Sequence, residues 1–74
     1  MEKQIIPIEL LVPMEKNPRK MDDHDFGELK LSIEKYGLVE PLVWNKRSGH
    51  VVGGHQRLTV IKELGWKEVE AVVV

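Results

Sequence analysis

A junction in the second half of the chain most constrains its fold. Residues 51–57, Val-Val-Gly-Gly-His-Gln-Arg, pass from β-branched residues through two glycines into the start of a helical pattern. Valine favours strands, and glycine lets the backbone turn tightly at little steric cost. We therefore expect a buried strand that runs directly into a helix, so that the first helical turn lies at the end of the strand.

The hydrophobic pattern of the remaining sequence predicts a small α+β domain. Strands are expected at 4–8, 41–45, 50–53 and 68–74, helices at 22–36 and 54–64, and a short helical turn at 9–12. A turn at 46–49 joins two of the strands into a hairpin, and an ordered loop with a basic tip occupies 14–21. The order strand, turn, helix, hairpin, helix, strand indicates a mixed sheet with two main helices.

Both helices carry recognisable ends. Asp22 is expected to cap the first helix by accepting from the N–H of Asp25, and Gly37 is expected to end it. Gly65 should end the second helix, with Trp66 closing a Schellman contact. The predicted buried side chains are Phe26, Leu29, Ile33 and Tyr36 in the first helix and Leu58, Ile61 and Leu64 in the second.

Two strand ends suggest how the sheet is bordered. Pro7 cannot donate to a neighbouring strand, so the first strand should lie at an edge or end there. The chain ends on three valines, Val72 to Val74. If that strand were an exposed edge, it would invite pairing between chains, and on this ground we expect a homodimer.

Composition excludes several classes of protein. The 74 residues form one domain, 1–74, and contain no cysteine, so disulfides, thiolate metal sites and a cysteine nucleophile are excluded. The net charge of −1 excludes a globally basic nucleic-acid wrapper, although a local basic patch remains allowed. No apolar run is long enough to cross a membrane, and the start of this sequence carries no hydrophobic signal-peptide segment, so we expect a cytoplasmic protein without a membrane partner.

The glycine junction is the best candidate site. The first N–H groups of a helix lack intrahelical acceptors and lie at the positive end of its dipole, an arrangement that suits a phosphate. Arg57 could add a bidentate donor, and Arg19 offers a second basic group. The predicted phosphate contacts are Gly53, Gly54, His55, Gln56, Arg57 and Arg19. The alternative is that the glycines serve only a tight connection.

Other polar residues give weaker signals. The acidic run 22–25 resembles a metal site in composition, but helix capping explains its carboxylates, and we predict no metal site. Glu40 precedes the strand that enters the hairpin and could hold Mg²⁺ beside a bound phosphate, or remain a solvated surface acid. His50 is expected on the surface of its strand.

Three segments in order resemble one family. They are 8–11 followed by Asn-Pro-Arg at 17–19, Tyr-Gly-Leu-Val-Glu-Pro-Leu-Val at 36–43, and residues 51–58. Together they resemble the ParB/sulfiredoxin superfamily, specifically the ParB-like nuclease domain, also called the ParB N-terminal domain. The last segment is the most specific, since it is similar to Gly-Glu-Arg-Arg of partition proteins and Gly-Gly-Cys-His-Arg of sulfiredoxins.

The resemblance implies a pocket for nucleotide phosphates. Partition-type members bind CTP, sulfiredoxins bind ATP with Mg²⁺, and related free-serine kinases use ADP. Gly53, Gly54 and Arg57 match the phosphate-contacting pattern, and Arg19 falls where the family often keeps a basic residue. The implied function is a module of a DNA-associated protein, either of partition or regulatory type or linked to a DNA methyltransferase. Its partners would be a nucleoside triphosphate with Mg²⁺, DNA, and the rest of a longer chain.

Departures from the family pattern narrow the expected activity. His55 stands where sulfiredoxins place their catalytic cysteine, which excludes sulfinic-acid reduction. His55, Gln56 and Thr59 also replace the acid and two arginines of the partition motif, so we favour binding over turnover. One alternative is a phosphotransferase or nuclease that uses His55 or Glu40 as base or metal ligand. The other is a structural docking domain, in which Arg57 would pair with a surface acid such as Glu63 or Glu68.

Overall fold

The computed structural model describes residues 2–14 and 22–74. Its elements are β1 (Glu2–Pro7), the 3₁₀ turn η1 (Ile8–Leu10), β2 (Val12–Pro13), α1 (Asp23–Tyr36), β3 (Leu42–Trp44), β4 (His50–Gly53), α2 (His55–Glu63) and β5 (Glu68–Val73). The five strands form one mixed sheet in the order β1-β5-β3-β4-β2. The predicted α+β class, the mixed sheet and the two main helices are confirmed.

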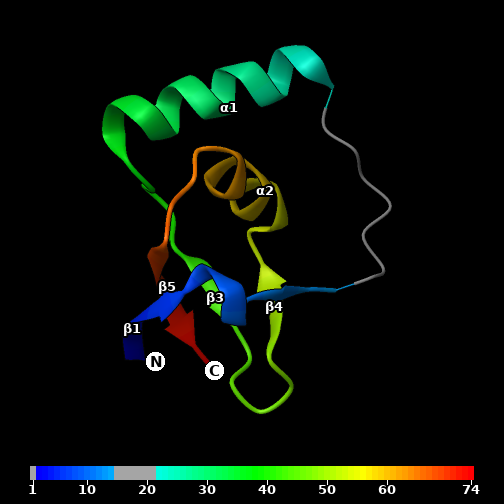
Figure 1. Cartoon of the computed structure of the whole chain (residues 1–74), viewed down its shortest axis with the longest axis vertical. Helices are drawn as coiled ribbons and strands as arrows, with labels where there is room; N and C mark the ends of the chain where they lie inside the picture. The colour runs from blue at the N-terminus through cyan, green and yellow to red at the C-terminus, as the bar shows by residue number, and fades with distance from the viewer. Residues whose placement is uncertain (1, 15–21) are drawn as a thin grey trace.

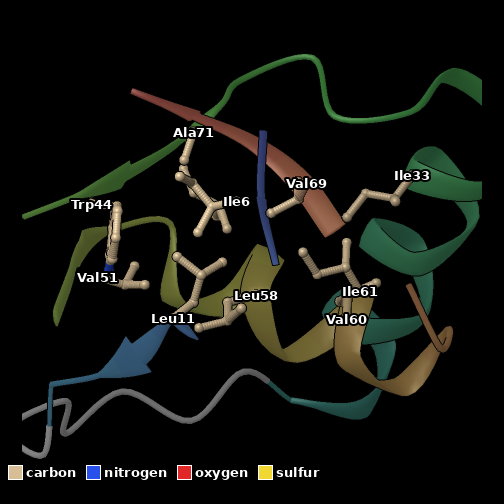
Figure 2. Packing of buried hydrophobic residues seen from close by; sticks show 11 residues of the cluster. Ile6, Leu11, Ile33, Trp44, Val51, Leu58, Val60, Ile61, Val69 and Ala71 are labelled. Carbon is tan, nitrogen blue, oxygen red and sulfur yellow. The ribbon is translucent and has the colours of Figure 1, made fainter. Parts of the chain in front are cut away.

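Helix α2 lies between α1 and the sheet (Figure 1). It is therefore buried on more than one side, and Leu58, Val60 and Ile61 all belong to the core. In Figure 2, Leu58 lies toward Leu11, whereas Ile61 lies toward Ile33 of α1. Leu64, expected in the core, is half-buried and packs against it.

The observed helix ends largely match the predicted ones. Asp22 Oδ1 accepts from the backbone N–H of Asp25 at 2.8 Å and caps α1. At the end of α2, the N–H of Gly65 donates to the carbonyl of Lys62 at 3.1 Å, and the N–H of Trp66 donates to that of Ile61 at 3.1 Å. These two bonds form the expected Schellman motif.

Two local predictions are wrong. Tyr36 does not belong to the buried stripe of α1, because it is 68% exposed. The centre of its ring lies 5.3 Å from the ammonium of Lys35. Val12 does not belong to a helical turn, since the turn ends at Leu10 and Val12 pairs in parallel with His50. A strand of two residues, β2, therefore completes one side of the sheet.

The position of β5 removes one argument for a dimer. Strand β1 is at an edge, as Pro7 predicted, and pairs antiparallel with β5. On its other side β5 pairs in parallel with β3, so Val72 and Val73 have neighbours on both sides. The C-terminal valines are not an exposed edge, and the homodimer stays a prediction without that support.

Candidate functional site

The junction between β4 and α2 is built on the neighbouring strand β3. Gly53 pairs with Val43 in the sheet, and a β-carbon at Gly53 would lie 3.4 Å from Val43. Gly54 has φ +88° and ψ +28°, the left-handed region that favours glycine. A β-carbon at Gly54 would come within 2.5 Å of Leu42 Cδ2. The tight strand-to-helix turn therefore requires glycine for both conformation and space.

The first turn of α2 presents free backbone donors. Its first helical bond runs from the N–H of Leu58 to the carbonyl of Gly54 at 2.9 Å. Gly54 has no side chain with which to cap the helix, and the first turn holds no acidic residue. Within 2–14 and 22–74, no hydrogen-bond acceptor is found for the backbone N–H groups of residues 55–57. These donors and the positive dipole end suit an anion.

Arg57 adds a fixed positive charge at the same place. Its side chain is 28% exposed, and Nη2 lies 3.5 Å from Oε2 of Glu40. The Nε atom is buried and has no hydrogen-bond partner within the described part of the chain. A guanidinium has five donors in a planar fork, so Arg57 retains capacity for a further acceptor such as a phosphate.

A pocket of about 190 Å³ opens beside Arg57. Its walls come from the second half of α1, from the connection between α1 and β3, and from α2. The lining residues are Leu29, Ser32, Ile33, Gly37, Leu38, Val39, Glu40 and Arg57. Most of these are apolar, so the charged groups Glu40 and Arg57 supply its ionic character.

The other predicted contacts are divided between described and undescribed residues. His55 is the first residue of α2, and its Nε2 is buried without a hydrogen-bond partner among the described residues. Gln56 follows it and is exposed. Arg19, and the basic loop to which it belongs, lie outside the described residues, so its predicted role stays a prediction.

The acidic start of α1 has local partners. Asp22 caps the helix, and His24 Nε2 lies 3.3 Å from Oε1 of Glu28, four residues along the exposed surface. Within the described ranges, no group of three or more His, Asp or Glu side chains could hold a metal ion. Across the same ranges, no helix is long and apolar enough to cross a bilayer.

The sequence did not predict how Glu40 and Arg57 meet. The docking alternative expected Arg57 to pair with a surface acid such as Glu63 or Glu68. Arg57 instead pairs with a different exposed acid, Glu40, while Glu63 lies 3.4 Å from Lys30 of α1. Glu40 was expected to hold Mg²⁺ beside a bound phosphate or to remain a solvated surface acid, and a contact with Arg57 was not among the expectations. Its contact with Arg57 depends on the register in which β3 and β4 pair; the sequence predicted the hairpin but not that register.

The strand–Gly–Gly–helix turn with Arg57 in the first helical turn is the feature that the ParB resemblance emphasised. A sequence profile described as ParB N-terminal domain matches residues 1–74, the whole chain. The chain belongs to the ParB N-terminal domain family. The resemblance found in the sequence is thereby confirmed.

Nucleoid occlusion proteins are among the curated relatives of this ParB N-terminal domain. The protein from Lysinibacillus sphaericus is 35% identical over 72 residues, covering 92% of this chain and 24% of that protein. The protein from Bacillus cereus strain AH187 is 33% identical over 76 residues, covering 97% of this chain and 26% of that protein. The chain thus spans about a quarter of the length of these relatives.

Solved structures share the fold. A C-terminally truncated chromosome-partitioning protein ParB from Caulobacter crescentus, complexed with CTP-gamma-S, superimposes with a TM-score of 0.83 at 25% identity. That match covers all of this chain and 44% of the other. Sulfiredoxin from Arabidopsis thaliana superimposes with a TM-score of 0.85 at 21% identity, covering all of this chain and 85% of that one. The sulfiredoxin likeness shows the common fold alone.

Proposed function

We propose that this ParB N-terminal domain binds the phosphates of a nucleoside triphosphate at the start of α2. The observation that carries the proposal is the convergence of unpartnered donors there. Backbone N–H groups of residues 55–57 and the Nε of Arg57 have no acceptor in the described ranges. A side chain at residue 54 would clash with Leu42, so the turn that presents these donors requires glycine there. One phosphate group has several acceptor oxygens and could therefore accept hydrogen bonds from several of these donors at once, more than a single water molecule could.

CTP is the nucleotide to test first. The Caulobacter ParB structure carries CTP-gamma-S, and its fold matches the whole of this chain. Magnesium would accompany the phosphates and be held mainly by phosphate oxygens and water, since Mg²⁺ keeps several of its waters at such sites. The cluster of three protein ligands that is missing from the described residues is therefore not required.

We further propose that the domain is one part of a longer, DNA-associated protein of partition or nucleoid-occlusion type. The support is twofold: the relatives are about four times as long as this chain, and a Caulobacter ParB structure is complexed to the centromeric parS site. That structure superimposes with a TM-score of 0.81 at 25% identity. DNA phosphates are thus a second source of the anion that the helix start would bind, and the experiment must separate the two.

Isothermal titration calorimetry with CTP, ATP, GTP and a short DNA duplex, each with and without Mg²⁺, tests the proposal. Charge-assisted hydrogen bonds each contribute about 1.5–3 kcal/mol, so Arg57→Ala should weaken nucleotide binding roughly 10- to 100-fold. The matched control is Arg47→Ala, which removes an exposed arginine from the β3–β4 turn. No heat from any ligand at millimolar concentration, or equal losses in both variants, would contradict the proposal.

Binding is favoured over the two alternatives by the surroundings of Arg57. The docking alternative predicted an arginine tied to a surface acid instead of facing a pocket. Arg57 does lie 3.5 Å from the exposed Glu40, but it also lines a pocket, and its buried Nε has no partner among the described residues, so it can still bind a further acceptor. Turnover would require metal-dependent hydrolysis of nucleotide or plasmid that is lost in His55→Ala. We expect intact plasmid and unhydrolysed nucleotide from the 74-residue chain.

A further inference from the structure

We propose that Glu40 acts as an anionic latch on Arg57. This inference rests on the phosphate site proposed above. Without ligand, the Glu40 carboxylate pairs with the guanidinium of Arg57; an incoming phosphate displaces it. The latch would set the minimum charge that a ligand needs to enter the site. Glu40 is then a specificity-determining residue, not a ligand of Mg²⁺.

The backbone holds Glu40 beside the start of α2. Pro41 follows it and restricts the residue before it to an extended conformation. Leu42, the next residue, is fully buried and lies against Gly54, while Val43 pairs with Gly53. Two consecutive residues of β3 are thus fixed against the two glycines of the turn. This packing places the carboxylate of Glu40 close to Arg57.

The charges around Arg57 explain why an acid is useful there. Arg57 is the third residue of α2, where a positive charge meets the positive end of the helix dipole. No acidic residue of the first turn offsets it. Glu40 Oε2, 3.5 Å from Nη2, is the anion that the structure places on this charge. In the proposed latch, this carboxylate oxygen is the acceptor that a phosphate oxygen would replace on Arg57.

The contact is nevertheless weak enough to be exchanged. Charge-assisted N–H···O hydrogen bonds are typically about 2.7–2.9 Å long, so a separation of 3.5 Å leaves the guanidinium loosely held. The Glu40 side chain is 75% exposed and can turn into solvent, and exposed ion pairs contribute little to stability. A phosphate group brings more charge and more acceptors than one carboxylate. We therefore expect polyphosphates to displace Glu40, and singly charged carboxylates or chloride to fail.

Calorimetric titration of pyrophosphate and CTP into Glu40→Gln tests the latch, in EDTA and in Mg²⁺. Removing the competing charge should strengthen binding about two- to fivefold in EDTA. Glu68→Gln is the control, since it makes the same change of net charge at an exposed residue of β5 that lines no pocket beside Arg57. The double variant Glu40→Gln/Arg57→Ala should show no gain over Arg57→Ala alone.

The possible failures of this experiment are distinguishable. If the wild-type chain binds and Glu40→Gln binds equally well in EDTA, the latch is overturned and the phosphate site stands. If Glu40→Gln binds more weakly only in Mg²⁺, Glu40 is a metal ligand and the latch is overturned. If neither the wild-type chain nor Glu40→Gln binds either probe, the latch and the proposed function both fail. Binding gained only in Glu40→Gln would support both.

Discussion

Leu42 and Gly54 are in such close contact that a β-carbon on the glycine would lie 2.5 Å from Cδ2 of the leucine. Leu42 is fully buried in the core, and Gly54 is the N-cap of α2. The same contact therefore packs the sheet against the helix at the turn where the N–H groups of residues 55–57 have no acceptor among the described residues. The fold and the proposed site depend on one another at this point.

Gly54→Ala should destabilise the domain more than a glycine-to-alanine change in open space. Left-handed backbone costs a non-glycine residue roughly 1–2 kcal/mol, and overpacking a well-packed core adds about 1–3 kcal/mol. Gly49→Ala is the matched control, because Gly49 has φ +77° but nothing within 4 Å of its β-carbon position. The free energy of unfolding from urea denaturation checks this. Equal losses in both variants would show that the contact with Leu42 relaxes freely.

The cap of α1 should contribute measurably to stability. Asp22→Ala removes the acceptor of the 2.8 Å bond from the N–H of Asp25, and loss of an N-cap costs roughly 0.5–2 kcal/mol. Asp23→Ala removes a charge from the first turn but no capping bond, so its effect should be smaller. Thermal unfolding followed by circular dichroism compares the two. A larger loss in Asp23→Ala would contradict the capping assignment.

The burial of α2 on more than one side predicts a sensitive core position. Ile61 is fully buried between the helices and the sheet, and Ile61→Val should cost about 0.5–1.5 kcal/mol by leaving a small cavity. Leu31→Ala, on an α1 residue that is 68% exposed, should change stability by less than about 0.5 kcal/mol. Denaturant midpoints of the two variants, measured under identical conditions, compare their losses of stability. A larger loss in Leu31→Ala than in Ile61→Val would contradict the packing of α2.

Local signals predicted those parts of the fold that depend on neighbouring residues. Asp22 capped its helix as expected because capping joins residues three apart, and Gly65 with Trp66 closed α2 for a similar reason. Tyr36 was misassigned because helical spacing continued past the point where α1 still faces the core. The burial of Val60 was missed because an amphipathic pattern predicts one buried face, whereas α2 is covered by both α1 and the sheet.

Long-range pairing was beyond the reach of local patterns. Strand β2 consists of two residues and exists only because Val12 and Pro13 meet β4 across the chain. The interior position of β5 follows from its pairing with both β1 and β3, and it overturned the expectation of an exposed valine edge. At the proposed site, the strand–Gly–Gly–helix turn was predicted from the local sequence and is observed, whereas the phosphate-binding roles of its two glycines and of Arg57 stay predictions. The contact between Glu40 and Arg57 depends on the register in which β3 and β4 pair, so it could not be predicted from the local sequence.

Titration of the ¹⁵N-labelled chain with CTP and Mg²⁺, followed by amide chemical shifts, tests the central claim most directly. If phosphates bind at the start of α2, the largest shifts should fall on the N–H groups of residues 55–57 and on the Nε–H of Arg57. The matching control is the same titration of Arg57→Ala, in which those shifts should need a higher ligand concentration. Shifts confined to another surface, such as the pocket lined by Ile8, Lys62 and Lys67, would contradict the account.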